Sequence, residues 1–371
     1  MKLAIIKIGG RITANANGAT GGEVLHAVEL LLKGGNDIHC FTTIIKNDKL
    51  INGVKIRDIL QFDVNEKFDA LIVINGNINF YGGVTSDHEM QNLKIINSFK
   101  GKVVYMLFDP MLPLKQYWDG IETKQEKYNW KKKYSKEEIY IERDDIIYIS
   151  QPYDLEAVND LLLKTGVKHS KIYHYPLYKM HLTTYDRFEF KEIDREVDIS
   201  YGGTFRNKKR ESKLIKFYFH YPEEYKVEIF GKIELEQFSQ NKIRSLRPPK
   251  FCKGVSHDMV RDRMSKSLST IVIGDKWYEG RNLAQRIYEN ILSNTITFID
   301  KELDPKRLVY GSDDPFFDQL YVSSKDEVIE LIEKTKLDKK LIKHICNKQY
   351  EAVQINKQEY INNLTNLIGE A

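Results

Sequence analysis

Two glycines and two arginines form the segment of this chain best suited to bind a phosphate group. Within Tyr201–Arg210, Gly203 and Thr204 are followed by Arg206 and Arg210. Glycines let the backbone approach a ligand closely, and the start of a helix offers free N–H groups and positive potential. Arginines four residues apart share a helix face and can bind a diphosphate together. The alternative is an ordinary tight turn beside two solvated arginines.

Carboxylates at the ends of predicted strands are the candidates for proton transfer and for hydroxyl recognition. Asp109 directly follows the apolar strand Val103–Phe108, where it is either a general base or a helix cap. Further on, Arg286 and Glu289 are three residues apart on a predicted helix, so they face the same side. Glu289 could accept hydrogen bonds from ribose hydroxyls while Arg286 binds phosphate. The alternative is a surface ion pair of little energetic value.

Two basic segments could bind nucleic acid. Lys124–Lys133 holds five lysines, among them Lys131, Lys132 and Lys133, with two aromatic residues between them. Lys242–Lys253 includes Arg244 and Arg247 around a pair of prolines. Mixed basic and aromatic loops can bind phosphates and stack on bases, although most charge runs are solvated surface. The formal net charge of +4 does not by itself demand a nucleic-acid partner.

Composition fits a globular protein and excludes several classes. Of 371 residues, 42% are hydrophobic and 30% charged, and no apolar run approaches the ~18 residues needed to span a bilayer. The apolar N-terminus reads as a first buried strand, not a signal peptide. The three cysteines are far apart and lack metal-ligand spacing, which favours reduced thiols in a cytoplasm. The chain has no GxGxxG motif, P-loop or GxSxG elbow.

Alternating strand and helix patterns predict two α/β domains. In the first half we expect strands at residues 3–8, 38–43, 70–75, 103–108, 146–150 and 172–175, with helices at 23–32 and 155–165. After a polar linker at 183–197, strands are expected at 198–201, 226–230, 270–273 and 295–299, with helices at 211–219 and 283–292 and a helical tail from 325. Such alternation is typical of parallel sheets covered by helices, which bind ligands beyond the carboxyl ends of their strands.

The chain resembles the T-even bacteriophage DNA β-glucosyltransferase family. Four segments carry the resemblance, in the family's order from residue 1 to about 300: residues 77–83, 107–113, 201–213 and 273–289. The resemblance implies an α/β GT-B fold, with two Rossmann-like doubly wound domains facing a central cleft. Residues 1–182 would form the acceptor domain and 196–349 the UDP-sugar domain, with helix 350–371 packing back on the first.

The resemblance also implies an activity. The family transfers glucose from UDP-glucose to the hydroxymethyl group of 5-hydroxymethylcytosine in duplex DNA, with inversion at the sugar, which protects phage DNA from host nucleases. Base flipping is expected, because the hydroxymethyl group is hard to reach inside a duplex. A divalent ion, Mg²⁺ or Mn²⁺, could aid turnover or product release, although the metal ligands are unknown. We expect a monomer without membrane partners in the cytoplasm of the infected bacterium.

Site residues follow from the matching motifs. Asp109 would be the general base and Glu23, on the Gly21–Glu23 turn, an acidic partner near the sugar. The UDP-sugar would be bound by residues of the second domain: Gly203, Thr204, Arg206, Arg210, Val255, Asp275, Arg286 and Glu289. DNA would contact Asn79 and Tyr81 in the segment that resembles a DNA-facing loop. The two basic segments add five further candidates for DNA contact: Lys131, Lys132, Lys133, Arg244 and Arg247.

The sequence departs from the family around the expected sugar pocket. Pro176–Tyr178 lacks the acidic residue that the family has there, Thr204 replaces a serine, and the loop 11–20 has its own sequence. A different UDP-sugar, such as UDP-arabinose, or a different modified pyrimidine is therefore an alternative. A non-catalytic duplex-DNA binder is the alternative of another class, but Asp109 together with both arginines favours an enzyme.

Overall fold

The computed structural model describes residues 1–8, 19–42, 50–75, 86–108, 143–150, 172–192, 195–203, 208–231, 247–255, 259–274, 279–280 and 283–370. The chain forms two compact units, one of residues 1–184 and 356–371 and the other of residues 185–355. Each unit is built on its own mostly parallel sheet. The predicted α/β class with two sheet domains is thus confirmed.

The sheet of the first unit has the order β3-β4-β2-β1-β5-β6-β7-β8. Its strands are β1 (Lys2–Ile8), β2 (Asp37–Thr42), β3 (Leu50–Ile51), β4 (Val54–Asp58), β5 (Ala70–Asn75), β6 (Lys102–Leu107), β7 (Ile147–Ser150) and β8 (Ile172–His174). All neighbours are parallel except the edge pair β3–β4. Central strands such as β5 are buried on both faces, which explains their unbroken apolar sequences.

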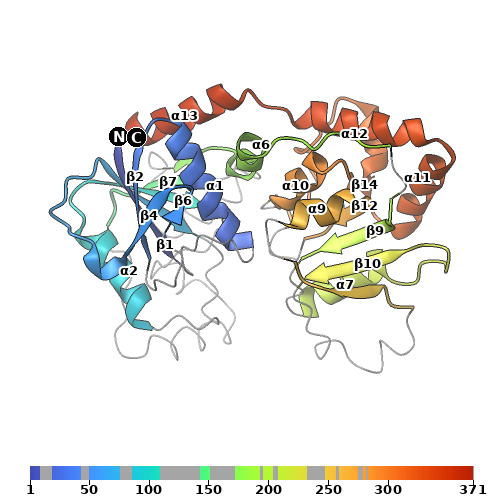
Figure 1. Cartoon of the computed structure of the whole chain (residues 1–371), viewed down its shortest axis with the longest axis horizontal. Helices are drawn as coiled ribbons and strands as arrows, with labels where there is room; N and C mark the ends of the chain where they lie inside the picture. Colours follow the sequence, from blue (N-terminus) through green and yellow to red (C-terminus); the bar gives the residue numbers. More distant parts are fainter. Residues whose placement is uncertain are drawn as a thin grey trace. The chain divides into compact units, whose positions relative to one another are not determined.

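Helices pack around this sheet. They are α1 (Ala19–Lys33), α2 (Ser86–Ser98), α6 (Met180–Thr184) and α13 (Lys357–Glu370), with short 3₁₀ turns at Ile59–Gln61 and Leu177–Lys179. Leu93 and Ile96 of α2 share a core cluster with Ala4 and Ile6 of β1. The helices α1, α6 and α13 contact one another. Helix α13 brings the C-terminus beside Met1, as Figure 1 shows.

The helix that returns to the first unit begins later than the predicted residue 350. Helix α12 (Lys339–Val353) belongs to the second unit, and the chain passes to the first unit at Asn356, just before α13. Residues 350–353 continue α12 because Val353 extends the buried stripe of Ile345, Cys346 and Gln349. In α13, the Tyr360 hydroxyl donates to the Pro176 carbonyl at 2.8 Å.

The second unit has the strand order β11-β10-β9-β12-β13-β14, all parallel. The strands are β9 (Val197–Gly202), β10 (Val227–Gly231), β11 (Lys250–Lys253), β12 (Ser267–Val272), β13 (Ile296–Asp300) and β14 (Tyr321–Val322). Its helices are α7 (Lys208–Tyr218), α9 (Val260–Ser265), α10 (Arg286–Leu292), α11 (Lys325–Leu337) and α12, with a 3₁₀ turn at Pro315–Leu320. This is the Rossmann order 3-2-1-4-5-6. The chain reverses direction across the sheet between β9 and β12, where such folds bind ligands.

Candidate functional site

Three glycines meet at the carboxyl edge of the second sheet. Gly203 follows β9, Gly231 ends β10 and Gly254 follows β11. The Gly203 N–H donates to the Phe230 carbonyl at 2.9 Å. Gly231 has φ 143°, and a Cβ added to it would lie 1.8 Å from the Gly203 carbonyl oxygen, while one added to Gly254 would lie 3.2 Å from the Gly231 carbonyl carbon. The edge is therefore a surface of closely packed backbone without side chains, as a bound nucleotide would require.

Arg286 lies over this glycine edge. A Cβ at Gly203 would be 2.8 Å from Arg286 Nη1 and 2.9 Å from the Tyr201 hydroxyl, so the missing side chain leaves room for the guanidinium. Its Nε atom has no hydrogen-bond partner among the described residues. The structure thus brings a cation to the end of β9 from a helix more than eighty residues further along the chain.

Glu289 lies beside Arg286 and is buried. Its Oε2 atom is 4.0 Å from Arg286 Nε, and its side chain is 4% exposed, against 24% for Arg286. The pair is therefore not the solvated surface pair considered from the sequence. A buried carboxylate next to an arginine at a sheet edge can accept hydrogen bonds from ligand hydroxyls while the guanidinium binds an anion.

The other predicted donor residues are placed only in part. Val255 is half-buried just beyond Gly254, where it packs with Cys252 against Phe230 and Met264. Arg210 belongs to the first turn of α7. Its side chain, together with Thr204, Arg206 and Asp275, lies outside the described residues, so their contacts stay predictions.

In the first unit, the segments predicted to bind the acceptor directly follow the carboxyl ends of two neighbouring strands, β5 and β6. Ile8 of β1 pairs with Asn75 of β5, and Asn75 pairs with Leu107 of β6, so these three ends are level. The segment of Asn79 and Tyr81 follows β5, and Asp109 comes two residues after Leu107; all three residues lie outside the described part. The edge is again the point where the strand order reverses, between β1 and β5.

Glu23 lies in a helix and not in the predicted turn. Helix α1 begins at Ala19 and includes both Gly21 and Gly22. Glycine costs roughly 1 kcal/mol in a helix interior, but the buried residues Val24, Ala27, Val28 and Leu31 stabilise α1 by packing. The Glu23 side chain is outside the described part, and its role near the sugar stays a prediction.

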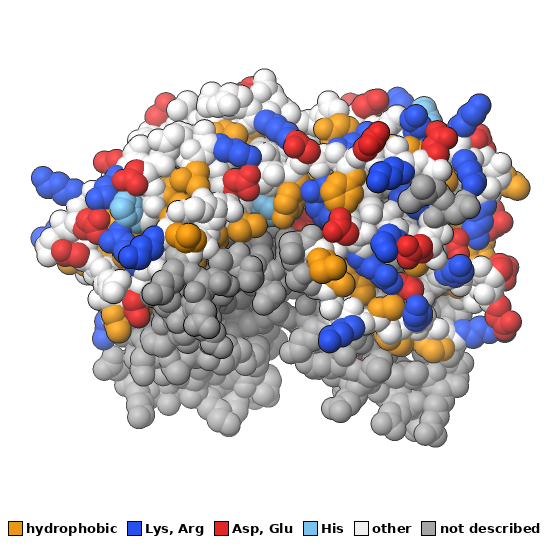
Figure 2. Space-filling model, in the orientation of Figure 1, with side chains coloured by type: hydrophobic (Ala, Val, Ile, Leu, Met, Phe, Trp, Pro, Cys, Tyr) orange, Lys and Arg blue, Asp and Glu red, His pale blue; other side chains and the backbone are white. Residues whose placement is uncertain are grey.

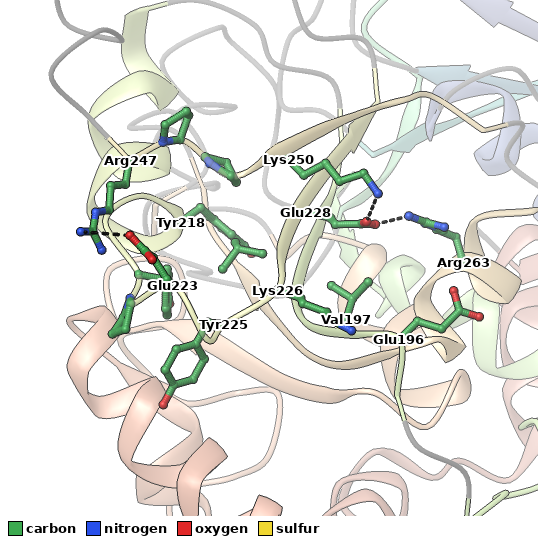
Figure 3. A pocket seen from close by; sticks show the side chains of 15 residues that line it. Glu196, Val197, Tyr218, Glu223, Tyr225, Lys226, Glu228, Arg247, Lys250 and Arg263 are labelled. Carbon is green, nitrogen blue, oxygen red and sulfur yellow. Dashed lines mark hydrogen bonds and ion pairs between the residues drawn. The ribbon is translucent and has the colours of Figure 1, made fainter.

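Arg247 lies at the opposite edge of the second sheet from the glycines. It lines a pocket of about 760 Å³ at the amino ends of β9, β10 and β11, together with Glu228, Lys250 and Arg263 (Figure 3). Val197, at the start of β9, lines the pocket and Gly203 is six residues further on, so about 20 Å of sheet separates the pocket from Gly203. Arg247 is therefore remote from the glycine edge, which is the predicted donor edge.

Most of the charged side chains that line this pocket form ion pairs. Arg247 Nη2 is 3.4 Å from Glu223 Oε1, with both side chains largely exposed. Glu228 bonds to Lys250 at 2.9 Å and to Arg263 (Figure 3). Burial acts to raise the pKa of Glu228, but the hydrogen bond from Lys250 and the charge of Arg263 lower it below its ordinary value. The ion pairs of this pocket therefore have a structural role. The other basic residues predicted to bind DNA lie outside the described residues: Lys131, Lys132, Lys133 and Arg244.

The described surface carries both signs of charge. Figure 2 shows lysines and arginines interspersed with acidic side chains on the visible face of each unit. Any attraction of DNA to that face must come from local groups and not from one broad basic field. No described helix is long and apolar enough to cross a membrane.

Comparison with known proteins gives the same assignment as the motifs. A family model described as Bacteriophage T4 beta-glucosyltransferase matches residues 1–175. The DNA beta-glucosyltransferase of Enterobacteria phage T4 is 27% identical over 352 residues, which cover 95% of this chain and 94% of that protein. The resemblance to the phage β-glucosyltransferases is confirmed.

Solved structures agree over the whole length. The T4 phage β-glucosyltransferase in complex with UDP and Mn²⁺ has a TM-score of 0.78 and 26% identity, with 99% of both chains covered. Anabaena Alr3699/HepE in complex with UDP-glucose has a TM-score of 0.60 and 11% identity over 100% of this chain and 99% of that one, a likeness of fold alone. The predicted GT-B fold is thereby confirmed.

Sequence reasoning missed several residues of the donor edge. Gly231 and Gly254 were not singled out, although a glycine directly after an apolar strand is a signal of close backbone approach. Lys213 of α7 was also missed; it forms ion pairs with Glu279, Asp300 and Glu302. Nothing in the local sequence shows that these four charges meet.

Proposed function

We propose that this chain transfers glucose from UDP-glucose to the hydroxymethyl group of 5-hydroxymethylcytosine in duplex DNA, with inversion at the sugar. The observation that supports this most is Arg286 lying against Gly203 at the reversal point of the second sheet, with the buried Glu289 beside it. The relatives support the same reading, because one is named a DNA β-glucosyltransferase and others are described with UDP or UDP-glucose.

The donor half of the proposal assigns each group a role. Glu289 accepts hydrogen bonds from the ribose hydroxyls, and Arg286, Arg206 and Arg210 bind the diphosphate. The glycine edge lets the nucleotide approach the backbone. When the bond between the anomeric carbon and UDP breaks, the departing diphosphate gains negative charge, and the arginines stabilise that charge.

The acceptor half needs one base. Asp109 takes the proton of the hydroxymethyl group as its oxygen attacks the anomeric carbon from the face opposite UDP. One C–O bond forms, one breaks, and UDP leaves with the electron pair of the broken bond, so the sugar configuration inverts. Asn79 and Tyr81 contact the DNA, and Glu23 lies near the sugar. We place this activity in the cytoplasm of the infected bacterium.

A divalent metal has no assigned ligands in this proposal. Among the described residues, no group of three or more His, Cys, Asp or Glu side chains is arranged to hold a metal ion. A bound Mg²⁺ or Mn²⁺ would supply further positive charge to the departing diphosphate.

The test is a product assay over several donors and acceptors. The chain is incubated with UDP-glucose, UDP-galactose or UDP-arabinose and with duplexes containing cytosine, 5-hydroxymethylcytosine or 5-hydroxymethyluracil, and the digested nucleosides are weighed by mass spectrometry. We expect a hexose on 5-hydroxymethylcytosine with UDP-glucose alone. The panel of sugars is needed because this chain lacks the acidic residue that the family has near the sugar pocket. The corresponding stretch has Leu177, which is fully buried. Duplex binding without transfer from any donor would contradict the proposal and favour a DNA-binding protein.

A further inference from the structure

Lys213 forms a compact ion cluster with three carboxylates in the second unit. Its Nζ atom is 2.5 Å from Glu279 Oε1 and 3.0 Å from Glu302 Oε2, and it also bonds to Asp300. Lys213 comes three residues after Arg210 on α7, so the two share a helix face. Lys213 therefore lies on the helix that carries Arg210, one of the three arginines of the proposed diphosphate site.

The cluster is buried enough for its charges to matter. The Lys213 side chain is 11% exposed and that of Asp300 is 1% exposed. Burial acts to lower the pKa of Lys213, but hydrogen bonds with Asp300 and Glu279 more than offset it, so the pKa is raised and the lysine stays charged. One ammonium faces three carboxylates, of which Asp300 is 1% exposed and Glu279 21% exposed, whereas Glu302 is 59% exposed to solvent. Compensation by Lys213 therefore matters most for the two less exposed carboxylates.

The three carboxylates come from two different segments. Asp300 ends β13 and Glu302 follows it, whereas Glu279 lies in the connection from β12 to α10. That connection includes Asp275 and ends at Arg286, the residue that contacts the glycine edge. The adjacent Gly280 donates its N–H to the Leu303 carbonyl at 3.4 Å. The Lys213–Glu279 pair therefore joins α7 directly to the segment that leads to Arg286.

We propose that Glu279, acting through Lys213, is a positioning residue for the nucleoside diphosphate. The pair sets the distance between Arg210 on α7 and Arg286 on α10, and the two guanidiniums must match one diphosphate. Binding of a ligand by groups from separate elements requires those elements to be held within a fraction of an ångström. This inference rests on the proposed function, because it takes the diphosphate as the ligand of both arginines.

Substitution of two partners of Lys213, one at a time, separates a positioning role from a purely structural role of the cluster. Glu279→Gln and Glu302→Gln each remove one negative charge from the cluster and leave the buried Asp300 pair intact. Only Glu279→Gln weakens the link between α7 and the donor segment, because the amide oxygen can still accept a hydrogen bond but carries no charge. Calorimetry with UDP, and steady-state kinetics with UDP-glucose and hydroxymethylated duplex, are measured for wild type and both variants.

We expect Glu279→Gln to weaken UDP binding and raise KM for UDP-glucose by about five- to tenfold, with kcat and the KM for DNA within about twofold of wild type. Glu302→Gln should leave the UDP affinity, both KM values and kcat within about twofold of wild type. Lys213→Arg, which keeps the charge, should retain most of the UDP affinity.

Equal UDP affinities of Glu279→Gln and Glu302→Gln would overturn the positioning role and leave the cluster a structural one. If Glu279→Gln does not fold, Glu279→Asp withdraws the carboxylate by one methylene and keeps its charge; unchanged UDP affinity in that variant would overturn the role equally. A wild-type chain that binds no UDP would instead contradict the proposed function, so the two failures are distinguishable.

Discussion

Replacement of Gly231 by alanine tests whether backbone segments meet at the donor edge. Gly231 has φ 143°, and its added Cβ would lie 1.8 Å from the Gly203 carbonyl oxygen and 2.7 Å from the carbonyl carbon. Ordinary contacts between heavy atoms are about 3.5 Å, so one of the two backbones must move by roughly 1.7 Å. Gly203 cannot move freely, because its N–H donates to Phe230 at 2.9 Å.

The cost has two parts. An alanine in this backbone conformation is strained by about 1–3 kcal/mol, and the overlap with Gly203 adds about 1–3 kcal/mol. Gly311 is a matched control in the same unit, because it has φ 82° and nothing within 4 Å of its added Cβ. Gly311→Ala should therefore show the strain of about 1–2 kcal/mol without the overlap.

Urea unfolding and UDP calorimetry measure both effects. We expect Gly231→Ala to lose about 1–3 kcal/mol more unfolding free energy than Gly311→Ala. A displaced Gly203 should also weaken UDP binding about tenfold, which corresponds to about 1.4 kcal/mol, whereas Gly311→Ala should bind UDP like wild type. Equal stability losses together with equal UDP affinities would refute the close approach of these two strand ends.

Three further predictions concern the donor, the DNA and pH. Arg206→Ala and Arg210→Ala should each lower the affinity for UDP about tenfold or more in calorimetry, since a charge-assisted contact contributes about 1.5–3 kcal/mol. Glu289→Ala should lower the affinity for UDP more than the affinity for 2′,3′-dideoxy-UDP, and equal losses would exclude a ribose contact. Neutralising Lys131–Lys133 together should reduce the salt dependence of duplex binding, about −0.9 per phosphate contact, without changing UDP affinity; an unchanged salt slope would make this segment a solvated surface. The folded pKa of Glu228 is lowered from 4.5, so its contribution to stability is present at neutral pH and is lost as the pH falls below that value. In urea unfolding, Glu228→Gln should be less stable than wild type at pH 7 and should lose less stability than wild type between pH 6 and pH 3. Parallel pH profiles of the two proteins would contradict the ion pairing of Glu228.

The sequence predicts the central strands of both sheets and also the edge strand β8, but it misses β3, β4, β11 and β14, which lie at or next to sheet edges. Ala70–Asn75 and Thr270–Ile273 are continuous apolar runs, and the structure places strands there. Strand β11 is Lys-Phe-Cys-Lys, partly exposed at a sheet edge, and its composition gives little signal. Helix α1 shows the opposite difficulty, because its two glycines indicate a turn while packing further along keeps the segment helical.

The donor site is predictable in its residue types but not in its contacts. Motif resemblance singles out Gly203, Arg286 and Glu289, and the structure brings them together. The role of Gly231 depends on a contact with a residue 28 positions earlier in the chain, and the Lys213 cluster joins residues up to 89 positions apart. Such contacts follow from the strand order of the sheet, which no local pattern encodes.

We propose that Asp109 activates a hydroxymethyl group of DNA for attack on a UDP-bound sugar. The most direct test compares wild type with Asp109→Asn, with glucose transfer to 5-hydroxymethylcytosine duplex and UDP affinity measured on the same samples. We predict rapid transfer by wild type, and in the variant a rate lower by about 10²–10⁴ with UDP affinity unchanged. Near-normal transfer by Asp109→Asn, or a wild-type chain that binds UDP and duplex yet transfers no sugar, would contradict the claim.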